Sequence, residues 1–176
     1  MDEDRGFVLW LTGLSGAGKS TLAALLKERL RRDGYEVEVL DGDEVRRHLG
    51  QGLGFSRADR DANVARISYV ARLLSRHGVV VIVAAISPYR EARARAREEI
   101  GRFVEIYVKC PLEVCAARDV KGLYRRALAG RIPHFTGVSD PYEEPENPEL
   151  TLHTPRADPH ETPERLLSPP AAMGVI

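Results

Sequence analysis

One short stretch constrains the fold of this chain more than any other feature. Residues 13–20 read Gly-Leu-Ser-Gly-Ala-Gly-Lys-Ser, and they stand between an apolar run at 7–11 and a helix-like run that begins at Thr21. A G-x-x-x-x-G-K-S sequence between a strand and a helix is a P-loop, which binds the phosphates of a nucleoside triphosphate. We therefore expect a strand, a phosphate-binding turn and a helix in direct succession.

Each part of the P-loop has its own physical task. The glycines let backbone N–H groups turn inward around the phosphates, and the start of the helix adds partial positive charge. Lys19 can reach the terminal phosphates, and the Ser20 hydroxyl is a ligand for Mg²⁺. The alternative is a glycine-rich turn that binds nothing. The expected ATP-binding residues are Gly13, Leu14, Ser15, Gly16, Ala17, Gly18, Lys19, Ser20 and Thr21.

Composition narrows the class of protein. A chain of 176 residues suits one α/β domain, and its 26 acidic and 26 basic side chains cancel, which argues against a nucleic-acid partner. Cys110 and Cys115 have neither zinc-ligand nor redox spacing, and no secretory leader precedes the P-loop, so a reduced, cytoplasmic setting is expected. The longest apolar run, 79–86, is too short to cross a bilayer, so no membrane contact is expected.

Helix and strand patterns alternate along the chain. Leucines at helical spacing follow the P-loop up to Gly34, the pair Ser56 and Asp59 is typical of the start of a second helix, and a third helix is expected before the fourth strand. This alternation predicts an α/β fold of the P-loop NTPase type, with a parallel sheet, helices on both faces and ligands at the carboxyl ends of the strands. The expected strands are 7–11, 36–40, 79–85, 103–108 and 150–152.

Two segments depart from this alternation. Residues 121–149 mix glycines and prolines with basic and aromatic residues, which is typical of a mobile flap over a site, and we interpret them as a lid. In the tail, residues 155–176, five prolines leave space only for a short helix around 164–167, and loose attachment is expected. The predicted domain therefore covers residues 1–154.

Two carboxylates follow the second expected strand directly. Asp41-Gly42-Asp43 falls on the same edge of the sheet as the P-loop, although Asp-Gly is also ordinary turn chemistry and a solvated turn is an alternative. The strand at 79–85 does not end in the acidic residue that normally orders Mg²⁺ in P-loop enzymes. Asp43, with Asp41 as the second candidate, can fill that gap as a metal ligand or as the base for a substrate hydroxyl.

A basic cluster is expected near the same edge. Arg60 and Asn63 share one helix face, and Arg46 and Arg66 are nearby in sequence. Such a cluster suits an anionic co-substrate, while the alternative is a solvated charged surface.

Two phenylalanines allow two readings, and one serine has a simple structural interpretation. Phe55 and Phe135 lie in glycine-rich loops, where they either anchor the loops or sandwich a base. Ser87 stands between the central strand and Pro88, and we interpret it as a helix N-cap.

Taken together, these segments resemble the adenylylsulfate kinases, which phosphorylate the 3′-hydroxyl of adenosine 5′-phosphosulfate with ATP to give 3′-phosphoadenylylsulfate. The resemblance covers residues 10–154, and its segments stand in the order typical of the family. Besides the P-loop they are Leu40–Asp43, Leu53–Ser56, Asp59–Asn63, Ile86–Arg90, Arg118–Tyr124, Phe135–Gly137 and Asp140–Glu143.

The resemblance implies how the acceptor is bound. Its adenine would lie between Phe55 and Phe135. Closure of residues 121–149 over both nucleotides would exclude water and prevent wasteful ATP hydrolysis. Arg46, Arg60 and Asn63 would hold the phosphosulfate group, and Asp43, Ile86, Ser87 and Lys121 would line the acceptor site.

The resemblance also implies the donor side and the assembly. Arg118 would pack near the base of ATP, and Ser20 and Asp43 would lie beside Mg²⁺, the expected cofactor. Lys19, Asp43 and Ser87 are the candidate catalytic residues; we favour direct in-line transfer over a phosphoserine at Ser87, because it needs only positioning and charge stabilisation. Members of the family form homodimers, and functional coupling to ATP sulfurylase stays open.

Several positions depart from the family pattern, and other functions compete with it. The departures are Glu44, Ala65, Ala84-Ala85 and Pro133-His134, together with a shortened last helix; lost positive charge there would weaken acceptor binding or lid closure. The rivals are a kinase for a sugar acid or another nucleoside, an ATP-responsive regulatory module, and a nucleic-acid end kinase. The paired loop phenylalanines favour an acceptor with an aromatic base over a sugar acid. Asp43 tests the regulatory module, because a module that only senses ATP needs no base.

Overall fold

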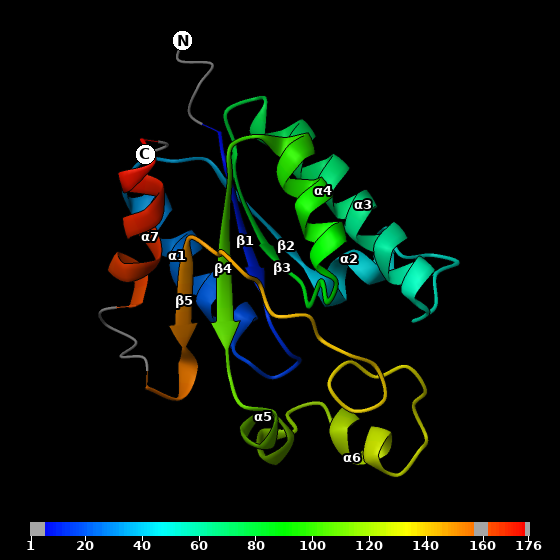
Figure 1. Cartoon of the computed structure of the whole chain (residues 1–176). Helices are drawn as coiled ribbons and strands as arrows, with labels where there is room; N and C mark the ends of the chain where they lie inside the picture. Colours follow the sequence, from blue (N-terminus) through cyan, green and yellow to red (C-terminus); the bar gives the residue numbers. More distant parts are fainter. Residues whose placement is uncertain (1–5, 157–161, 175–176) are drawn as a thin grey trace.

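A five-stranded parallel sheet forms the centre of the protein (Figure 1). The computed structural model describes residues 6–156 and 162–174. The strand order is β2-β3-β1-β4-β5, which confirms the predicted α/β fold with a parallel sheet. The strands are β1 (Val8–Thr12), β2 (Val37–Asp41), β3 (Val80–Ala84), β4 (Phe103–Lys109) and β5 (Leu150–His153).

Helices cover both faces of the sheet. Figure 1 shows α1 and α7 on one face, α3 and α4 on the other, and α5 and α6 beyond the carboxyl ends of the strands. None of the described helices is long and apolar enough to cross a membrane. The helices are α1 (Lys19–Arg32), α2 (Gly42–His48), α3 (Arg57–Ser75), α4 (Arg90–Ile100), α5 (Leu112–Arg118), α6 (Leu123–Leu128) and α7 (Thr162–Ala172).

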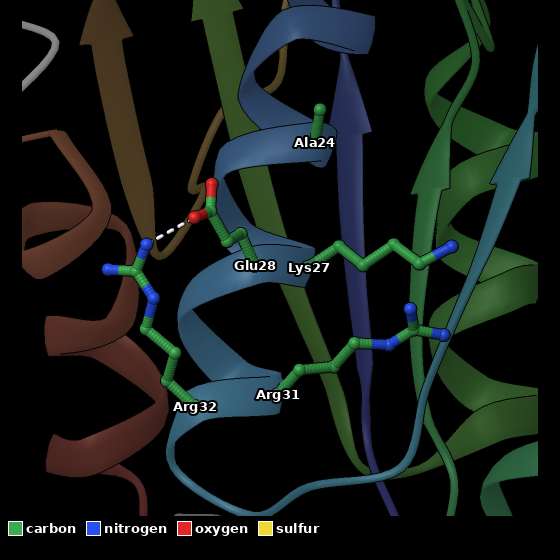
Figure 2. A pocket seen from close by; sticks show the side chains of 5 residues that line it. All are labelled: Ala24, Lys27, Glu28, Arg31 and Arg32. Carbon is green, nitrogen blue, oxygen red and sulfur yellow. Dashed lines mark hydrogen bonds and ion pairs between the residues drawn. The ribbon is translucent and has the colours of Figure 1, made fainter.

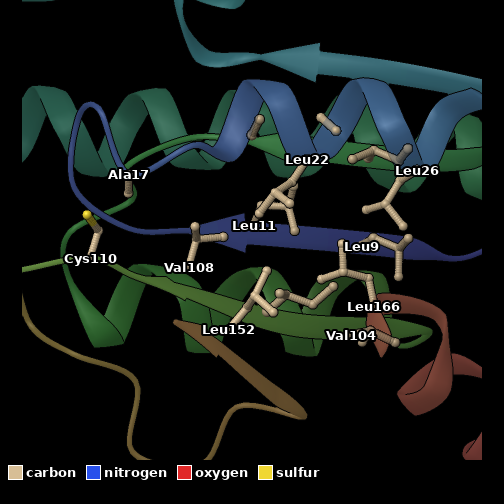
Figure 3. Close-up of a cluster of buried hydrophobic side chains, with 14 of the residues drawn as sticks. Leu9, Leu11, Ala17, Leu22, Leu26, Val104, Val108, Cys110, Leu152 and Leu166 are labelled. Carbon is tan, nitrogen blue, oxygen red and sulfur yellow. The ribbon is translucent and has the colours of Figure 1, made fainter. Parts of the chain in front are cut away.

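The central strand β1 faces two separate apolar cores. Leu9 and Leu11 pack on the side of α1, where Figure 3 shows them beside Leu22 and Leu26. Trp10 points to the opposite side and belongs to the cluster of α3 and α4. A parallel strand with helices on both faces must be apolar at every position, which explains why the run before the P-loop does not alternate with polar residues.

The C-terminal helix α7 is longer than the sequence predicted. It covers Thr162–Ala172, not a short segment around 164–167, and Pro169 and Pro170 lie inside it. Leu166 is fully buried in the same core as Leu9, and Glu164 forms an ion pair with Arg29 of α1. The expectation of loose attachment is therefore wrong for residues 162–174, because burial of leucines outweighs the helix-breaking effect of proline. The domain boundary at residue 154 stays a prediction.

Capping residues decide where two of the helices begin. Ser56 is the N-cap of α3, and its hydroxyl accepts a hydrogen bond from the N–H of Asp59 at 3.2 Å, which confirms the predicted capping pair. Asp41 caps α2 in the same way through the N–H of Asp43, at 3.1 Å. We did not expect α2, because a short helix with only Val45 buried has no visible apolar period.

We expect Leu166→Ala to lower the free energy of unfolding by about 2–5 kcal/mol, because it leaves a cavity in the core shared with β1. Met173→Ala, at an exposed position near the end of α7, is the matched control and should change stability little. Urea unfolding of both variants measures the difference. Equal stabilities would show that α7 is not part of the cooperative core.

Candidate functional site

The P-loop turns from the end of β1 into α1, and its glycines have distinct structural reasons. A Cβ atom at Gly13 would lie 2.4 Å from the carbonyl oxygen of Val108 in β4, so a side chain cannot fit there. Gly16 and Gly18 have φ angles of 78° and 103°, a region that side chains disfavour. Gly18 is also the N-cap of α1, so the loop ends with helix N–H groups directed at its centre.

Lys19 lies at the centre of this loop. Its ammonium group donates hydrogen bonds to the carbonyl oxygens of Gly13 and Leu14, both at 2.8 Å, and the residue is only 8% exposed. Burial lowers the pKa of Lys19 to about 8, because desolvation disfavours the charged form. An anion bound in the loop would stabilise the same charge.

The first carboxylate of the Asp-Gly-Asp segment faces the P-loop. Asp41 Oδ2 accepts a hydrogen bond from the Ser20 hydroxyl at 2.5 Å. The sequence placed Asp43 first as the partner of Ser20 in a metal site, whereas the structure brings Asp41 to that serine. A hydroxyl and a carboxylate are hard oxygen ligands, so the pair fits Mg²⁺, which takes few protein ligands besides water and substrate phosphates.

The second carboxylate faces the predicted lid. Asp43 forms an ion pair with Lys121, and both side chains are exposed at the carboxyl edge of the sheet. Arg118, just before the lid, donates a hydrogen bond to the carbonyl oxygen of Gly16 at 3.3 Å. The start of the lid therefore contacts α2, and the residue Arg118 that precedes it contacts the P-loop.

Arg60 joins the two loops that carry the candidate phenylalanines. Its guanidinium donates to the carbonyl oxygen of Phe55 at 3.0 Å and to that of His134 at 2.6 Å. Arg46 lies over the exposed Phe55 ring, 4.1 Å from its centroid. Arg66, by contrast, donates to the carbonyl oxygen of Leu49 at 2.6 Å. Arg46 and Arg60 thus gather at Phe55, and Arg66 supports a turn.

Phe135 is a buried anchor of its loop. It is 8% exposed and packs edge-to-face with Tyr124 at a centroid distance of 5.0 Å. The sequence left open whether Phe55 and Phe135 anchor loops or hold a base; Phe135 does the first, and the second stays a prediction. In α3, the Oδ1 atom of Asn63 is buried with no hydrogen-bond partner among the described residues, so it can accept a hydrogen bond from a ligand.

Ser87 is not the N-cap of α4, and that interpretation was wrong. The helix begins at Arg90, and Tyr89 is its N-cap residue. Ser87 has a φ of 43°, and its hydroxyl accepts a hydrogen bond from Trp10 Nε1 at 3.0 Å and donates to the carbonyl oxygen of Ala85 at 3.2 Å. A left-handed backbone at a serine is strained, so these partners hold the strand end in an uncommon conformation. A catalytic role for Ser87 stays a prediction.

The cap of α4 comes from the far end of the lid. The Glu143 carboxylate accepts a hydrogen bond from the N–H of Arg90 at 2.9 Å, and the Glu143 N–H donates to the carbonyl oxygen of Pro88 at 2.8 Å. No local sequence signal could reveal a cap that lies about fifty residues away in the chain.

Arg93 holds the segment around Glu143 through buried contacts. It is 2% exposed, pairs with Glu105 of β4 at 3.1 Å, and donates to the carbonyl oxygens of Ser87 and Glu143, both at 2.6 Å. Burial raises the pKa of Glu105, and the positive charge of Arg93 opposes that rise. Sequence reasoning missed Arg93, because one more arginine in the Arg-rich helix α4 carries no distinguishing pattern.

A separate hollow of about 470 Å³ lies on the outer surface of α1 (Figure 2). Lys27 and Arg31 extend to one side of the helix, and Glu28 pairs with Arg32 on the other. Only one helix and the ends of long side chains line this hollow, and no residue of the P-loop or the lid reaches it. It is therefore not the candidate site.

Comparison with known proteins decides the family. The adenylylsulphate kinase family model matches residues 5–153. The chain belongs to the adenylylsulphate kinase family. The adenylyl-sulfate kinase of Synechococcus sp. (strain JA-3-3Ab) is 61% identical over 150 residues, which are 85% of each chain, and that of Gloeothece citriformis (strain PCC 7424) is 53% identical over 174 residues, which are 99% of each.

A solved structure of this family has the same fold. The APS kinase CysC of Mycobacterium tuberculosis, in complex with AMPPNP and APS, superimposes with a TM-score of 0.90 at 45% identity. The match covers 94% of this chain and 97% of that one. The resemblance and the P-loop NTPase fold inferred from the sequence are therefore confirmed.

We expect Arg93→Met to lower the free energy of unfolding by about 3–5 kcal/mol, because it leaves the buried Glu105 carboxylate with only the more distant Arg97, at 3.8 Å, as a partner. Arg93→Met combined with Glu105→Gln should recover much of that loss, since no buried charge then remains. Chemical unfolding of the two variants at pH 7 tests this. A double variant less stable than the single one would contradict the uncompensated charge as the cause.

Proposed function

We propose that this chain transfers the terminal phosphoryl group of ATP to the 3′-hydroxyl of adenosine 5′-phosphosulfate (APS), giving 3′-phosphoadenylylsulfate and ADP. Membership of the adenylylsulphate kinase family supports this activity. The main structural support for this activity is that two side-chain pairs lie at the carboxyl edge of the sheet. Ser20 is hydrogen-bonded to Asp41, and Asp43 forms an ion pair with Lys121. A phosphate-binding loop, a pair able to bind a metal ion and a second, exposed carboxylate are the parts that phosphoryl transfer to a hydroxyl needs.

On the donor side, the P-loop backbone and Lys19 hold the phosphates, and Arg118 lies at the mouth of the loop for the base of ATP. Mg²⁺ would be held by Ser20 and Asp41, with Asp43 close by, and it supplies charge neutralisation for the phosphates when bound. Asp43 accepts the proton of the attacking hydroxyl. Its exposed ion pair with Lys121 is weak enough for the carboxylate to turn toward a substrate.

On the acceptor side, Arg46 and Arg60 form a binding site for an anion. Burial lowers the pKa of both guanidinium groups, and in Arg60 the neighbouring charge of Arg46 adds to the effect. An anionic phosphosulfate between them would offset that cost. The Asn63 NH₂ group would donate to the phosphosulfate, and the unpartnered Oδ1 of the same side chain would accept from an O–H or N–H group elsewhere on APS. Phe55 offers an exposed ring for the adenine, and the family resemblance implies that Ile86, Ser87 and Phe135 line the same site.

Three wider statements remain predictions of the family resemblance. We propose that the chain forms a homodimer, that it works in the cytoplasm in sulfate assimilation, and that residues 121–149 move as a lid. The two cysteines, Cys110 and Cys115, are free thiols, which suits a reducing compartment. Coupling to ATP sulfurylase is a question for a binding experiment between the two enzymes.

We expect Asp43→Asn to lower kcat by about 10²–10⁴-fold while the dissociation constant of Mg-ATP changes little, because the amide cannot accept the proton. The matched control is Glu44→Gln, which removes the neighbouring exposed carboxylate and should leave kcat intact. The measurement is ADP release with APS, gluconate or adenosine as acceptor. ADP release only with gluconate or adenosine would discard APS as the substrate, and ATP binding without any turnover would favour a regulatory module.

We expect ATP binding to weaken as the pH rises above 8. The ammonium of Lys19 has a pKa of about 8 in the free protein. Above that pH the protonated fraction falls about tenfold per pH unit, and the dissociation constant of ATP should rise in step. Titration calorimetry between pH 7 and 9.5 measures it.

Lys19→Arg is the control for this pH dependence. Arginine stays protonated throughout the range, so the variant should bind more weakly but with a flat profile. The buried thiol of Cys115, whose pKa is raised to about 12 by burial, remains neutral and adds no step. A wild-type profile as flat as that of the variant would contradict the role of the Lys19 charge.

A further inference from the structure

Tyr124 contacts both the P-loop and the loop of Phe135, through two different parts of its side chain. Its hydroxyl donates a hydrogen bond to the carbonyl oxygen of Ser15, inside the P-loop, at 2.6 Å. Its ring packs edge-to-face on Phe135, with a centroid distance of 5.0 Å and an interplanar angle of 79°. The residue is 2% exposed, so both contacts are made away from solvent.

The position of Tyr124 is fixed from its own helix as well. The Asp119 carboxylate accepts hydrogen bonds from the N–H groups of Tyr124 and Arg125, at 2.9 and 3.1 Å, and so caps the start of α6. Because the ring cannot swing freely, a shift of the Ser15 carbonyl must be followed by the tyrosine or must break the hydrogen bond. The P-loop backbone is the part that contacts the phosphates, so a bound nucleotide fixes the position of the Ser15 carbonyl.

The loop at Phe135 is stiff enough to pass such a shift onward. Its carbonyl oxygen accepts the N–H groups of three successive residues, 138–140, at 3.0–3.1 Å, and its N–H donates to the hydroxyl of Ser139 at 2.8 Å. The preceding residue, His134, holds Arg60 through its carbonyl at 2.6 Å. A continuous set of contacts therefore runs from the P-loop through Tyr124 and Phe135 to the guanidinium at the acceptor side.

We propose that Tyr124 is a positioning residue that couples the donor site to the acceptor site. A nucleotide in the P-loop fixes the Ser15 carbonyl, Tyr124 transmits that position to Phe135 and Arg60, and the affinity for APS rises. Coupling of this kind is reciprocal, so APS raises the affinity for the nucleotide by the same factor. This inference rests on the proposed function, since it takes APS as the ligand beside Phe135.

The test is Tyr124→Phe, which keeps the ring on Phe135 and removes only the hydroxyl. The dissociation constant of APS is measured by calorimetry with and without Mg-AMPPNP, and the ratio is the coupling factor. We expect a wild-type ratio of about 5- to 150-fold, and a variant ratio at least threefold smaller with the APS affinity of the nucleotide-free protein unchanged. Tyr69→Phe, at an exposed tyrosine of α3, is the control and should keep the wild-type ratio.

The outcomes separate this inference from the function on which it rests. An equal ratio in Tyr124→Phe and wild type overturns the inference, and so does a wild-type ratio near one, while APS-dependent ADP release would still stand. A variant that loses APS affinity equally with and without the nucleotide shows a role in local structure only and also overturns it. No binding or turnover of APS in the wild type overturns both proposals.

Discussion

The position of β1 is the constraint on which the rest of the structure depends. The strand is hydrogen-bonded to β3 on one side and to β4 on the other, and its side chains enter two separate cores. The P-loop leaves its carboxyl end, where Gly13 passes so close to Val108 of β4 that no Cβ fits. The phosphate-binding backbone is therefore held by the sheet itself. Because all neighbouring strands are parallel, their functional ends arrive at this same edge.

Much of this arrangement could be read from the sequence, because its signals are local. Apolar runs marked the strands, the pair Ser56 and Asp59 marked the start of α3, and the P-loop fixed the first β-α unit. The errors have one cause, which is contact between distant residues. The Ser87–Pro88 pair looks like a helix start, but the left-handed φ of Ser87 and the cap from Glu143 move the start to Arg90.

In the candidate site too, the sequence predicted the types of the residues but not the residues that they contact. The sequence identified both carboxylates of Asp41-Gly42-Asp43 but ranked them without knowing that α2 begins between them. The helix directs Asp41 back toward Ser20 and carries Asp43 toward Lys121, so two neighbouring residues of one type acquire different partners. Phe135 was placed correctly in a loop, yet only the fold shows that Tyr124 lies against it. The types of the functional residues are thus predictable from composition and spacing, whereas their contact partners become visible only in the folded structure.

The energies of the contacts at the two ends of residues 121–149 indicate which parts can move. The far end is held by Arg93, whose buried charge cannot leave Glu105 and Glu143 without a large desolvation cost. At the near end, Lys121 contacts α2 only through its exposed pair with Asp43, and exposed pairs contribute about 0–1 kcal/mol, whereas Tyr124 a little further along is buried. If residues 121–149 act as the proposed lid, release therefore costs least at the contact between Lys121 and Asp43, the carboxylate proposed to meet the substrate hydroxyl. A lid held firmly by Arg93 and released at Lys121 would exchange nucleotides without losing its remaining contacts.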